Sequence, residues 1–217
     1  MTSDRDAYYA KIRELARAKR EEFSVRTDAL GLKEINGIYR REKIKIDTRP
    51  LSSRLKALYM CSDNSYSVAI REKLPKTPKL FALVHELKHH WADRHLMEQG
   101  ILTCGSYNEN ELIEKAAEVF AAEFIYPEGE FSEHASCFME DRKIRTFCID
   151  DVVHFKRQFC KAKVSYTFIR KRLQWLNLAA SERLDGAQFQ KREDELYGAP
   201  IHRQPWFKER LKAKRPI

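Results

Sequence analysis

Hydrophobic and polar positions over the first third of the chain predict two helices followed by three short strands. Apolar side chains recur every three or four residues within the charged segment 4–30, which predicts one long helix. A shorter helix should follow it and end near Tyr39. The next three segments alternate polar and apolar residues or flank a Ser-Asp-Asn-Ser turn, as strands do: residues 43–47, 58–61 and 66–71. We therefore expect a small antiparallel sheet.

The rest of the chain is predicted to be mainly helical, because the whole sequence contains only seven glycines and seven prolines. The predicted helices are residues 77–97, 109–126, 150–158 and 165–176, with Thr77 and Asn108 as the expected caps of the first two. Residues 127–141 are predicted to form a loop. Residues 180–217 are polar and interrupted by glycine and proline, so we expect an extended tail that contains a short stretch of helix.

Composition and cysteine usage are those of a globular protein in a reducing compartment. The chain has 217 residues, of which 43% are hydrophobic, so it can bury a sizeable core. Its longest apolar-rich run, Val119–Tyr126, is far shorter than the roughly 20 residues of a membrane-spanning helix, and the first residues show no apolar leader. The five cysteines include no Cys-x-x-Cys pair, which favours free thiols in a cytoplasmic protein.

Basic residues outnumber acidic ones, 41 to 32, which gives a formal net charge of +9. The excess is concentrated in residues 142–172 and 203–217. Such segments are either solvated helix faces and a soluble tail, or a surface that meets DNA, RNA or an acidic protein. Charge alone does not decide between these two interpretations.

The most informative motif is His85-Glu86-Leu87-Lys88-His89, an HExxH sequence. On a helix, residues 85 and 89 lie one turn apart on the same face, so both imidazoles can reach one cation. Glu86 lies beside them and can take a proton from water without being a ligand itself. Two histidines on the surface of a helix could also produce this motif by chance. The four apolar residues that precede the motif, however, favour a buried helix.

A zinc site of this kind needs a third protein ligand and keeps one position open for water. His95 has the spacing of the third histidine in HExxHxxGxxH, but Ala92 replaces the glycine that would break the helix, so we expect His95 on the surface. Glu114 and Glu118 lie one turn apart on the next predicted helix. One of them would bind the metal while the other accepts the outer N–H of a ligand histidine. Spacing alone does not assign the two roles.

The HExxH helix followed by Glu114-x-x-Ala-Glu118-x-Phe-Ala-Ala-x-Phe-Ile-Tyr-Pro127 resembles the zinc metallopeptidases of the ImmA/IrrE type, over roughly residues 35–178. That family has an HExxH helix and a second helix with the pattern Glu-x-x-Ala-Asn-x-Phe-Ala-Ala-x-Leu-Leu-Met-Pro. This sequence departs from the family at two positions. Glu118 stands where the family usually has Asn, and Lys88 replaces a small residue, often Gly.

Together, the patterns and the resemblance predict an α+β fold: a mostly helical zincin-like core with a small antiparallel sheet, followed by basic C-terminal helices. The expected segments are an N-terminal helical segment (1–32), a metallopeptidase core (33–141), a basic helical subdomain (142–178) and a basic, loosely ordered tail (179–217). The resemblance implies one zinc ion per chain held by His85, His89 and Glu114, with Glu86 as the general base. Glu118 is then expected to orient a histidine ligand.

The resemblance also implies an activity. Characterised members of the family cut helix-turn-helix repressors at one site. We therefore expect a zinc-dependent endopeptidase whose protein substrate is a transcriptional repressor. The basic C-terminal region is expected to contact DNA. The residue that stabilises the oxyanion stays open among Tyr66, Tyr107, Tyr126 and His134. The alternative is a DNA- or partner-binding regulator with a structural metal site and little or no peptidase activity, in which Glu86→Gln would change nothing.

Overall fold

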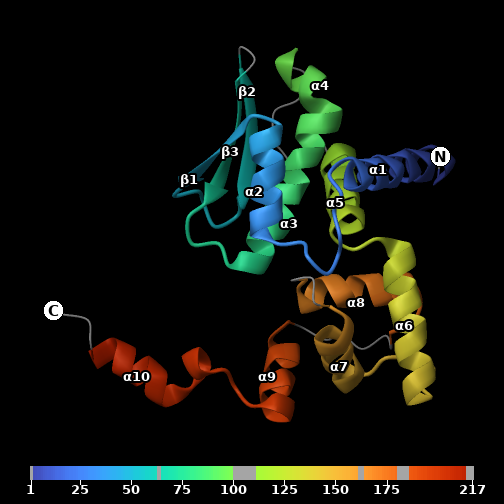
Figure 1. Ribbon diagram of the computed structural model, residues 1–217, viewed down its shortest axis with the longest axis vertical. Coiled ribbons are helices and arrows are strands. Elements are labelled where there is room, and N and C mark those ends of the chain that lie inside the picture. The colour runs from blue at the N-terminus through green and yellow to red at the C-terminus, as the bar shows by residue number, and fades with distance from the viewer. Residues whose placement is uncertain (1, 63–64, 100–110, 161–163, 180–185, 214–217) are drawn as a thin grey trace. The chain divides into compact units, whose positions relative to one another are not determined.

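The computed structural model of the protein describes residues 2–62, 65–99, 111–160, 164–179 and 186–213 (Figure 1). The chain divides into two compact units. The first comprises Met1–His134 and Cys160–Ser165, and the second comprises Ala135–Phe159 and Tyr166–Ile217. All the residues predicted to form the metal site lie in the first unit.

The first unit consists of helices packed on a small sheet, as the α+β prediction requires. Its helices are α1 (Thr2–Glu22), α2 (Leu32–Arg41), α3 (Lys76–Lys88), η1 (His89–Asp93), α4 (Arg94–Glu98) and α5 (Glu111–Ile125). Its strands are β1 (Ile44–Arg49), β2 (Ala57–Ser62) and β3 (Ser65–Arg71). Helix α6 (Glu128–Arg142) begins in this unit and ends in the second.

The sheet is mixed, which corrects the antiparallel sheet expected from the sequence. Its strand order is β1-β3-β2. Strands β2 and β3 form the predicted antiparallel hairpin, with Ala57 opposite Ile70, whereas β1 pairs with β3 in parallel, with Ile44 opposite Tyr66. The three strands alternate in direction along the chain. Because β3 lies in the middle of the sheet, the first and third strands become neighbours that run the same way.

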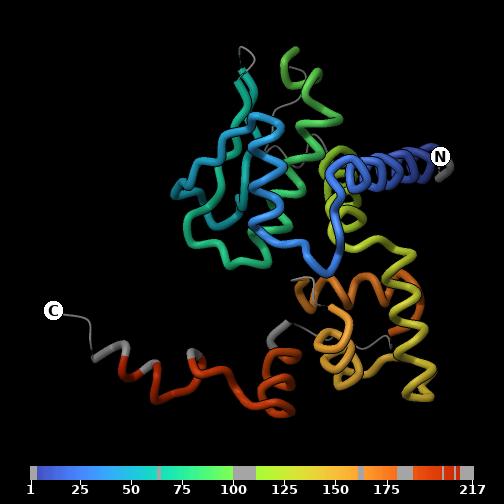
Figure 2. The backbone as a smooth tube through the Cα atoms, in the orientation of Figure 1, coloured from blue at the N-terminus to red at the C-terminus, as the bar shows by residue number. Residues whose placement is uncertain are grey.

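Helix α3 and its continuation carry the HExxH motif through the interior of the first unit, and Figure 2 allows the chain to be followed from β3 into this helix. Leu83, Val84 and Leu87 of α3 are completely buried. Helix α5 packs beside α3 and presents the fully buried alanines Ala117 and Ala121, small side chains that allow a close approach between helices. The two helices that carry the predicted metal ligands are therefore neighbours in the core.

Helix α1 is shorter than the predicted helix over residues 4–30. It ends at Glu22, and Ser24 then adopts the left-handed conformation with φ of 51°, which turns the chain away. Before this turn, the Arg20 guanidinium donates hydrogen bonds to the Phe124 carbonyl and to Thr27 Oγ1. The hydrogen bond to Phe124 holds the C-terminal end of α1 against the C-terminal end of α5.

The start of α3 also differs in detail from the prediction. The helix begins at Lys76, so Pro75 occupies the capping position and Thr77 lies inside the first turn. Asn108, the other expected cap, lies outside the described residues. The predicted helix over 77–97 is otherwise continuous, although residues 89–93 form a π-helical turn between α3 and α4.

Two segments contain more helix than the sequence predicts. Residues 127–141 were expected to be a loop, but α6 forms there because Phe131, Ala135 and Phe138 are buried at helical spacing. The expected extended tail contains α9 (Gly186–Tyr197), a 3₁₀ turn η2 (Ile201–Arg203) and α10 (Pro205–Ala213). Tertiary packing stabilises α9, since its buried Phe189 stacks on Tyr166 with the ring centroids 5.1 Å apart.

The second unit is formed mainly by α7 (Ile149–Phe159), α8 (Tyr166–Trp175) and α9. Its aromatic core contains Phe138 stacked on Phe147, with the ring centroids 5.3 Å apart. Arg192 of α9 forms two hydrogen bonds, 2.6 and 2.7 Å long, to the Asp150 carboxylate of α7. Within the described part of the chain, none of the helices combines the length and the apolar character that crossing a membrane requires.

Candidate metal centre

The structure brings together His85, His89 and Glu114, the three residues that the family resemblance implied as ligands. Nε2 of His85 lies 3.1 Å from Glu114 Oε2 and 3.3 Å from Nε2 of His89, and the latter lies 3.7 Å from Glu114 Oε1. The one-turn spacing of the HExxH motif places both imidazoles on the side of α3 and η1 that faces α5. The nearest ligand atoms of all three residues lie within 4.8 Å of one another, close enough to hold one metal ion.

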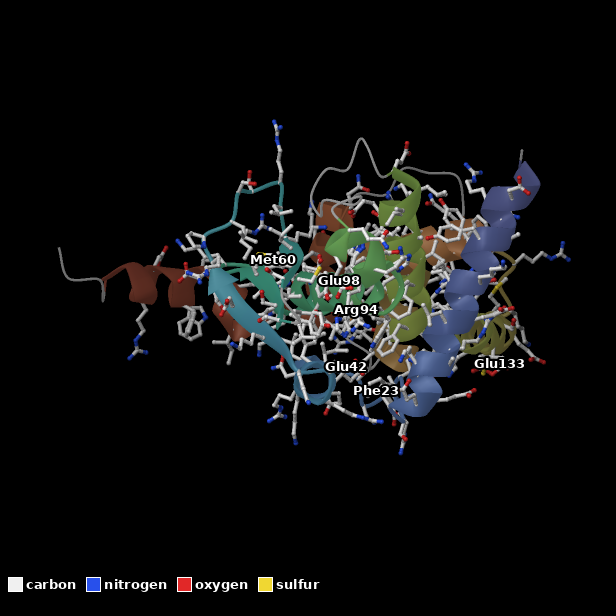
Figure 3. The ribbon with its side chains drawn as sticks, turned by 90° about the horizontal axis from the view of Figure 1, so that it is seen from above. Phe23, Glu42, Met60, Arg94, Glu98 and Glu133 are labelled. Atoms are coloured by element: carbon white, nitrogen blue, oxygen red, sulfur yellow. The ribbon has the colours of Figure 1, made fainter. Side chains whose placement is uncertain are left out.

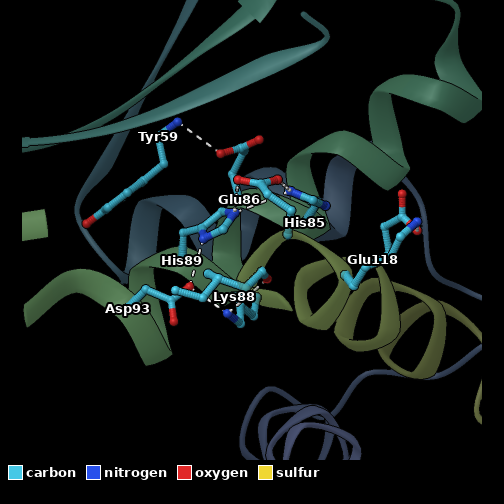
Figure 4. Close-up of polar contacts among 10 residues, drawn as sticks. Tyr59, His85, Glu86, Lys88, His89, Asp93 and Glu118 are labelled. Atoms are coloured by element: carbon cyan, nitrogen blue, oxygen red, sulfur yellow. Dashed lines mark hydrogen bonds and ion pairs between the residues drawn. The ribbon is translucent and has the colours of Figure 1, made fainter. Parts of the chain in front are cut away.

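Asp93 orients one of the two histidines, and the sequence reasoning missed this residue. Its Oδ2 lies 2.7 Å from Nδ1 of His89 (Figure 4). Because an ionised carboxylate only accepts hydrogen bonds, Nδ1 carries the proton and Nε2 keeps its lone pair for a cation. The signal was present in the sequence: Asp93 lies four residues after His89, one helical turn further along the same face.

Glu118 does not make the histidine contact expected of it. Its Oε2 pairs with Lys115 Nζ at 3.2 Å, and Figure 4 shows it further along α5 than the cluster. Asp93 instead makes the contact with the outer nitrogen of His89. Glu118 contributes to the site through its charge, which is one of several nearby charges that raise the pKa of His85.

Glu86 lies beside the cluster and faces the sheet. Its carboxylate accepts a hydrogen bond of 2.9 Å from the backbone N–H of Tyr59 on β2 (Figure 4). The residue is only 4% exposed. Glu86 is thus held next to the two histidines by its hydrogen bond to β2 and is not one of the three clustered residues, as expected of a proton acceptor that is not itself a ligand.

The neighbouring His90 anchors the π-helical turn to the sheet. Its Nδ1 lies 2.8 Å from the Tyr59 hydroxyl, and its Nε2 lies 3.3 Å from the Glu42 carboxylate. The guanidinium of Arg94 lies 5.2 Å from the centre of the Tyr66 ring, which in turn packs edge-on against His90. Figure 3 labels Glu42 and Arg94 in this region. These contacts fix the orientation of the turn that carries His89.

The other sequence candidates lie elsewhere or have other contacts. His95 is exposed on α4, as predicted, and does not belong to the cluster. Among the candidates for stabilising the oxyanion, the Tyr126 hydroxyl is hydrogen-bonded to Nδ1 of His134, and the Tyr66 ring packs against His90. Tyr107 lies outside the described residues. The contacts of Tyr66, Tyr126 and His134 do not select one of these three for the oxyanion role.

The electrostatics of the cluster favour a cation. Burial alone would raise the pKa of Glu114, but its hydrogen bond with His85 and the neighbouring positive groups outweigh burial and hold that pKa below the usual value. Burial alone would lower the pKa of His85, but the Glu114 carboxylate and further acidic groups outweigh it and raise that pKa. Both shifts show that the carboxylates attract positive charge to this point.

The donor set fits zinc. Two imidazole nitrogens and one carboxylate oxygen are the ligands of many catalytic zinc sites, in which a fourth position stays open for water or substrate. The hydrogen bond from His89 to Asp93 is the type of outer contact that fixes the orientation of a zinc-binding histidine. The residues present can therefore hold the ion that the sequence motif predicted.

Comparison with known families identifies the chain as a peptidase homologue. The sequence profile of peptidase family M78, described as the IrrE N-terminal-like domain, matches residues 40–174. The chain belongs to the peptidase M78 family. The match includes α3, η1 and α5, and therefore every residue of the cluster, and it confirms the resemblance inferred from the sequence. A search of curated proteins finds no match.

Proposed function

We propose that this member of the M78 family is a zinc-dependent endopeptidase that cleaves a protein substrate in the cytoplasm. The observation that carries the proposal is the convergence of His85, His89 and Glu114 within 4.8 Å, with Glu86 beside them on the same helix. Two histidines and a glutamate with an adjacent unliganded carboxylate are what peptide hydrolysis by a metallopeptidase requires.

The chain supplies the proton transfers of the reaction. Zinc held by His85, His89 and Glu114 would supply Lewis acidity, which acidifies a water molecule and polarises the scissile carbonyl. Glu86 takes the proton of the attacking water and delivers it to the amine that leaves, so that its carboxylate is regenerated in each cycle. Asp93 keeps His89 in the tautomer that leaves Nε2 available for the ion.

The position of β2 supports a peptide substrate in an extended conformation. This strand forms one edge of the described sheet. The Tyr59 N–H points from that edge to Glu86 instead of joining the ladder with β3. Because strand edges can bind extended peptides through main-chain hydrogen bonds, a substrate segment aligned along β2 would pass beside the proton acceptor.

The substrate class that we propose is a helix-turn-helix transcriptional repressor. Membership of the M78 family and the resemblance to ImmA/IrrE-type enzymes support it. The basic excess in residues 142–172 and 203–217 supports contact with a repressor bound to DNA, because these segments would be attracted to the phosphate backbone.

The test is cleavage of a purified helix-turn-helix repressor by the zinc-loaded protein, with the products identified by intact-mass spectrometry. We expect cleavage at one site by the wild type and none by Glu86→Gln at equal zinc content. Glu133→Gln, the same change at an exposed glutamate of α6, is the matched control and should still cleave. If Glu86→Gln cleaves as fast as the wild type, Glu86 is not the proton acceptor. If neither protein cleaves the repressor, the regulator with a structural metal site is favoured.

A further inference from the structure

Lys88 is a completely buried lysine in the centre of the proposed site. It precedes His89 directly in the HExxH motif, and its side chain is 0% exposed. A buried ammonium is strongly destabilised relative to water unless it is paired and hydrogen-bonded. Burial also lowers the pKa of Lys88, although the nearby Asp93 carboxylate opposes that shift. The contacts that the ammonium makes must therefore stabilise it substantially.

Those contacts connect the two helices that carry the metal ligands. The Lys88 ammonium donates a 2.6 Å hydrogen bond to Oδ2 of Asp93 and a 3.3 Å hydrogen bond to the carbonyl of Ile113 on α5 (Figure 4). Ile113 directly precedes Glu114. The same Oδ2 atom of Asp93 also accepts the hydrogen bond from His89. Lys88 thus touches the residue that orients one ligand and the peptide unit that precedes another.

We propose that Lys88 is a positioning residue for the metal site, whose ammonium holds the Asp93 carboxylate against Nδ1 of His89. The inference rests on the proposed zinc site and extends it to a residue outside the ligand set. With its oxygen fixed by two donors, Asp93 has one orientation, so His89 has one tautomer and one ring position. Without Lys88, the carboxylate can rotate away from His89 and the imidazole loses its orientation.

The sign of the effect on zinc affinity distinguishes this role from a simple charge effect. Lys88 is a positive charge close to a divalent cation, so its removal would tighten zinc binding if electrostatic repulsion dominated. If positioning dominates, its removal weakens binding instead. Loss of an outer partner of a metal ligand typically reduces affinity by about 10- to 100-fold. We expect a loss of about tenfold for Lys88→Met.

The experiment measures the zinc affinity of four variants by competition with a chromophoric chelator. They are Lys88→Met, Asp93→Asn, the double variant Lys88→Met/Asp93→Asn, and the control Lys76→Met, in which an exposed lysine at the start of α3 is replaced. The double variant removes both buried charges together and leaves neither unpaired, so it folds even if a single variant does not. Circular dichroism checks the folding of each.

We expect Asp93→Asn and the double variant to bind zinc equally weakly, because Lys88 acts through Asp93. Lys76→Met should bind as the wild type does. In the zinc-loaded protein, the Nδ1 proton of His89, followed by nitrogen-15 NMR, should exchange with water faster in Lys88→Met than in the wild type. A residue that only filled space would leave this exchange rate unchanged.

Unchanged or tighter zinc binding by a folded Lys88→Met overturns the positioning role. Additive losses in the double variant overturn it as well, because they would show that Lys88 acts by a route other than Asp93. Both results leave the proposed zinc site intact. If the wild type and Lys76→Met bind no zinc, the proposed function itself fails, and this result cannot be confused with the other two.

Discussion

The hydrogen bond between Glu86 and the backbone of β2 allows the catalytic and structural roles of this residue to be separated. Glu86 is buried, and its carboxylate accepts the Tyr59 N–H at 2.9 Å. Replacement by Gln keeps an acceptor oxygen at the same position but removes the basicity. Replacement by Ala removes both the acceptor and the base.

The structure gives different magnitudes for the two substitutions. A hydrogen bond to a charged group contributes about 1.5–3 kcal/mol to stability, and a neutral one about 1 kcal/mol. Glu86→Gln therefore loses at most about 1–2 kcal/mol of hydrogen-bond energy. Part of this loss is offset because the amide, unlike the carboxylate, carries no buried charge. Glu86→Ala leaves the Tyr59 N–H unpaired in the interior, which costs about 1–3 kcal/mol. For a chain of this size each kcal/mol lowers Tm by roughly 2–4 °C.

Thermal unfolding of the metal-free variants and cleavage of the repressor by the zinc-loaded variants measure the two roles. We expect Glu86→Gln to unfold close to the wild type and Glu86→Ala to unfold about 2–12 °C lower. Both variants should lose about 10²- to 10⁴-fold in cleavage rate, the typical contribution of a general base. Equal Tm values for the two variants would refute the hydrogen bond to Tyr59. A cleavage rate for Glu86→Gln within about threefold of the wild type would refute the role as proton acceptor.

Two further predictions concern stability. Tyr39→Phe removes the buried 2.8 Å hydrogen bond to the Leu83 carbonyl of α3. It should therefore destabilise the protein by about 1 kcal/mol in urea unfolding without changing zinc affinity. Altered zinc affinity would show that this hydrogen bond also shapes the metal site. The hydrogen bonds from Arg192 hold the pKa of Asp150 below its usual value. At pH values above the unfolded-state pKa, the ionised carboxylate therefore stabilises the fold. This stabilisation is lost as the pH falls through the lower folded-state pKa. Asp150→Asn should therefore lower Tm at about pH 7 and not at about pH 2, and a Tm difference independent of pH would contradict the ion pair.

The sequence predicts the centre of the site because the relevant geometry is local. Helical periodicity alone places His85 and His89 on one face, and the same periodicity reaches Asp93 one turn later. The second helix could be recognised from Glu114 and the small residues that follow it. The outer contact expected of Glu118 depends on how two helices are set against each other, which no local pattern determines, and the structure pairs Glu118 with Lys115.

The missed features of the fold depend on packing between distant segments. The parallel pairing of β1 depends on where β3 inserts, and alternation within β1 carries no information about its neighbour. The acidic, glycine-containing sequence of α6 suggested a loop, yet the spacing of Phe131, Ala135 and Phe138 was a helical signal that was overlooked. The contact of Lys88 with Ile113 joins residues 25 positions apart and required the structure.

The central claim is that His85, His89 and Glu114 bind one zinc ion, and elemental analysis of the purified protein tests it most directly. The account predicts about one zinc ion per chain in the wild type, in Glu86→Gln and in Glu118→Ala, and loss of the metal in His85→Ala and Glu114→Ala. Loss in Glu118→Ala with retention in Glu114→Ala would exchange the roles of the two glutamates. A wild-type protein that holds no zinc, even after dialysis against the metal, would contradict the account.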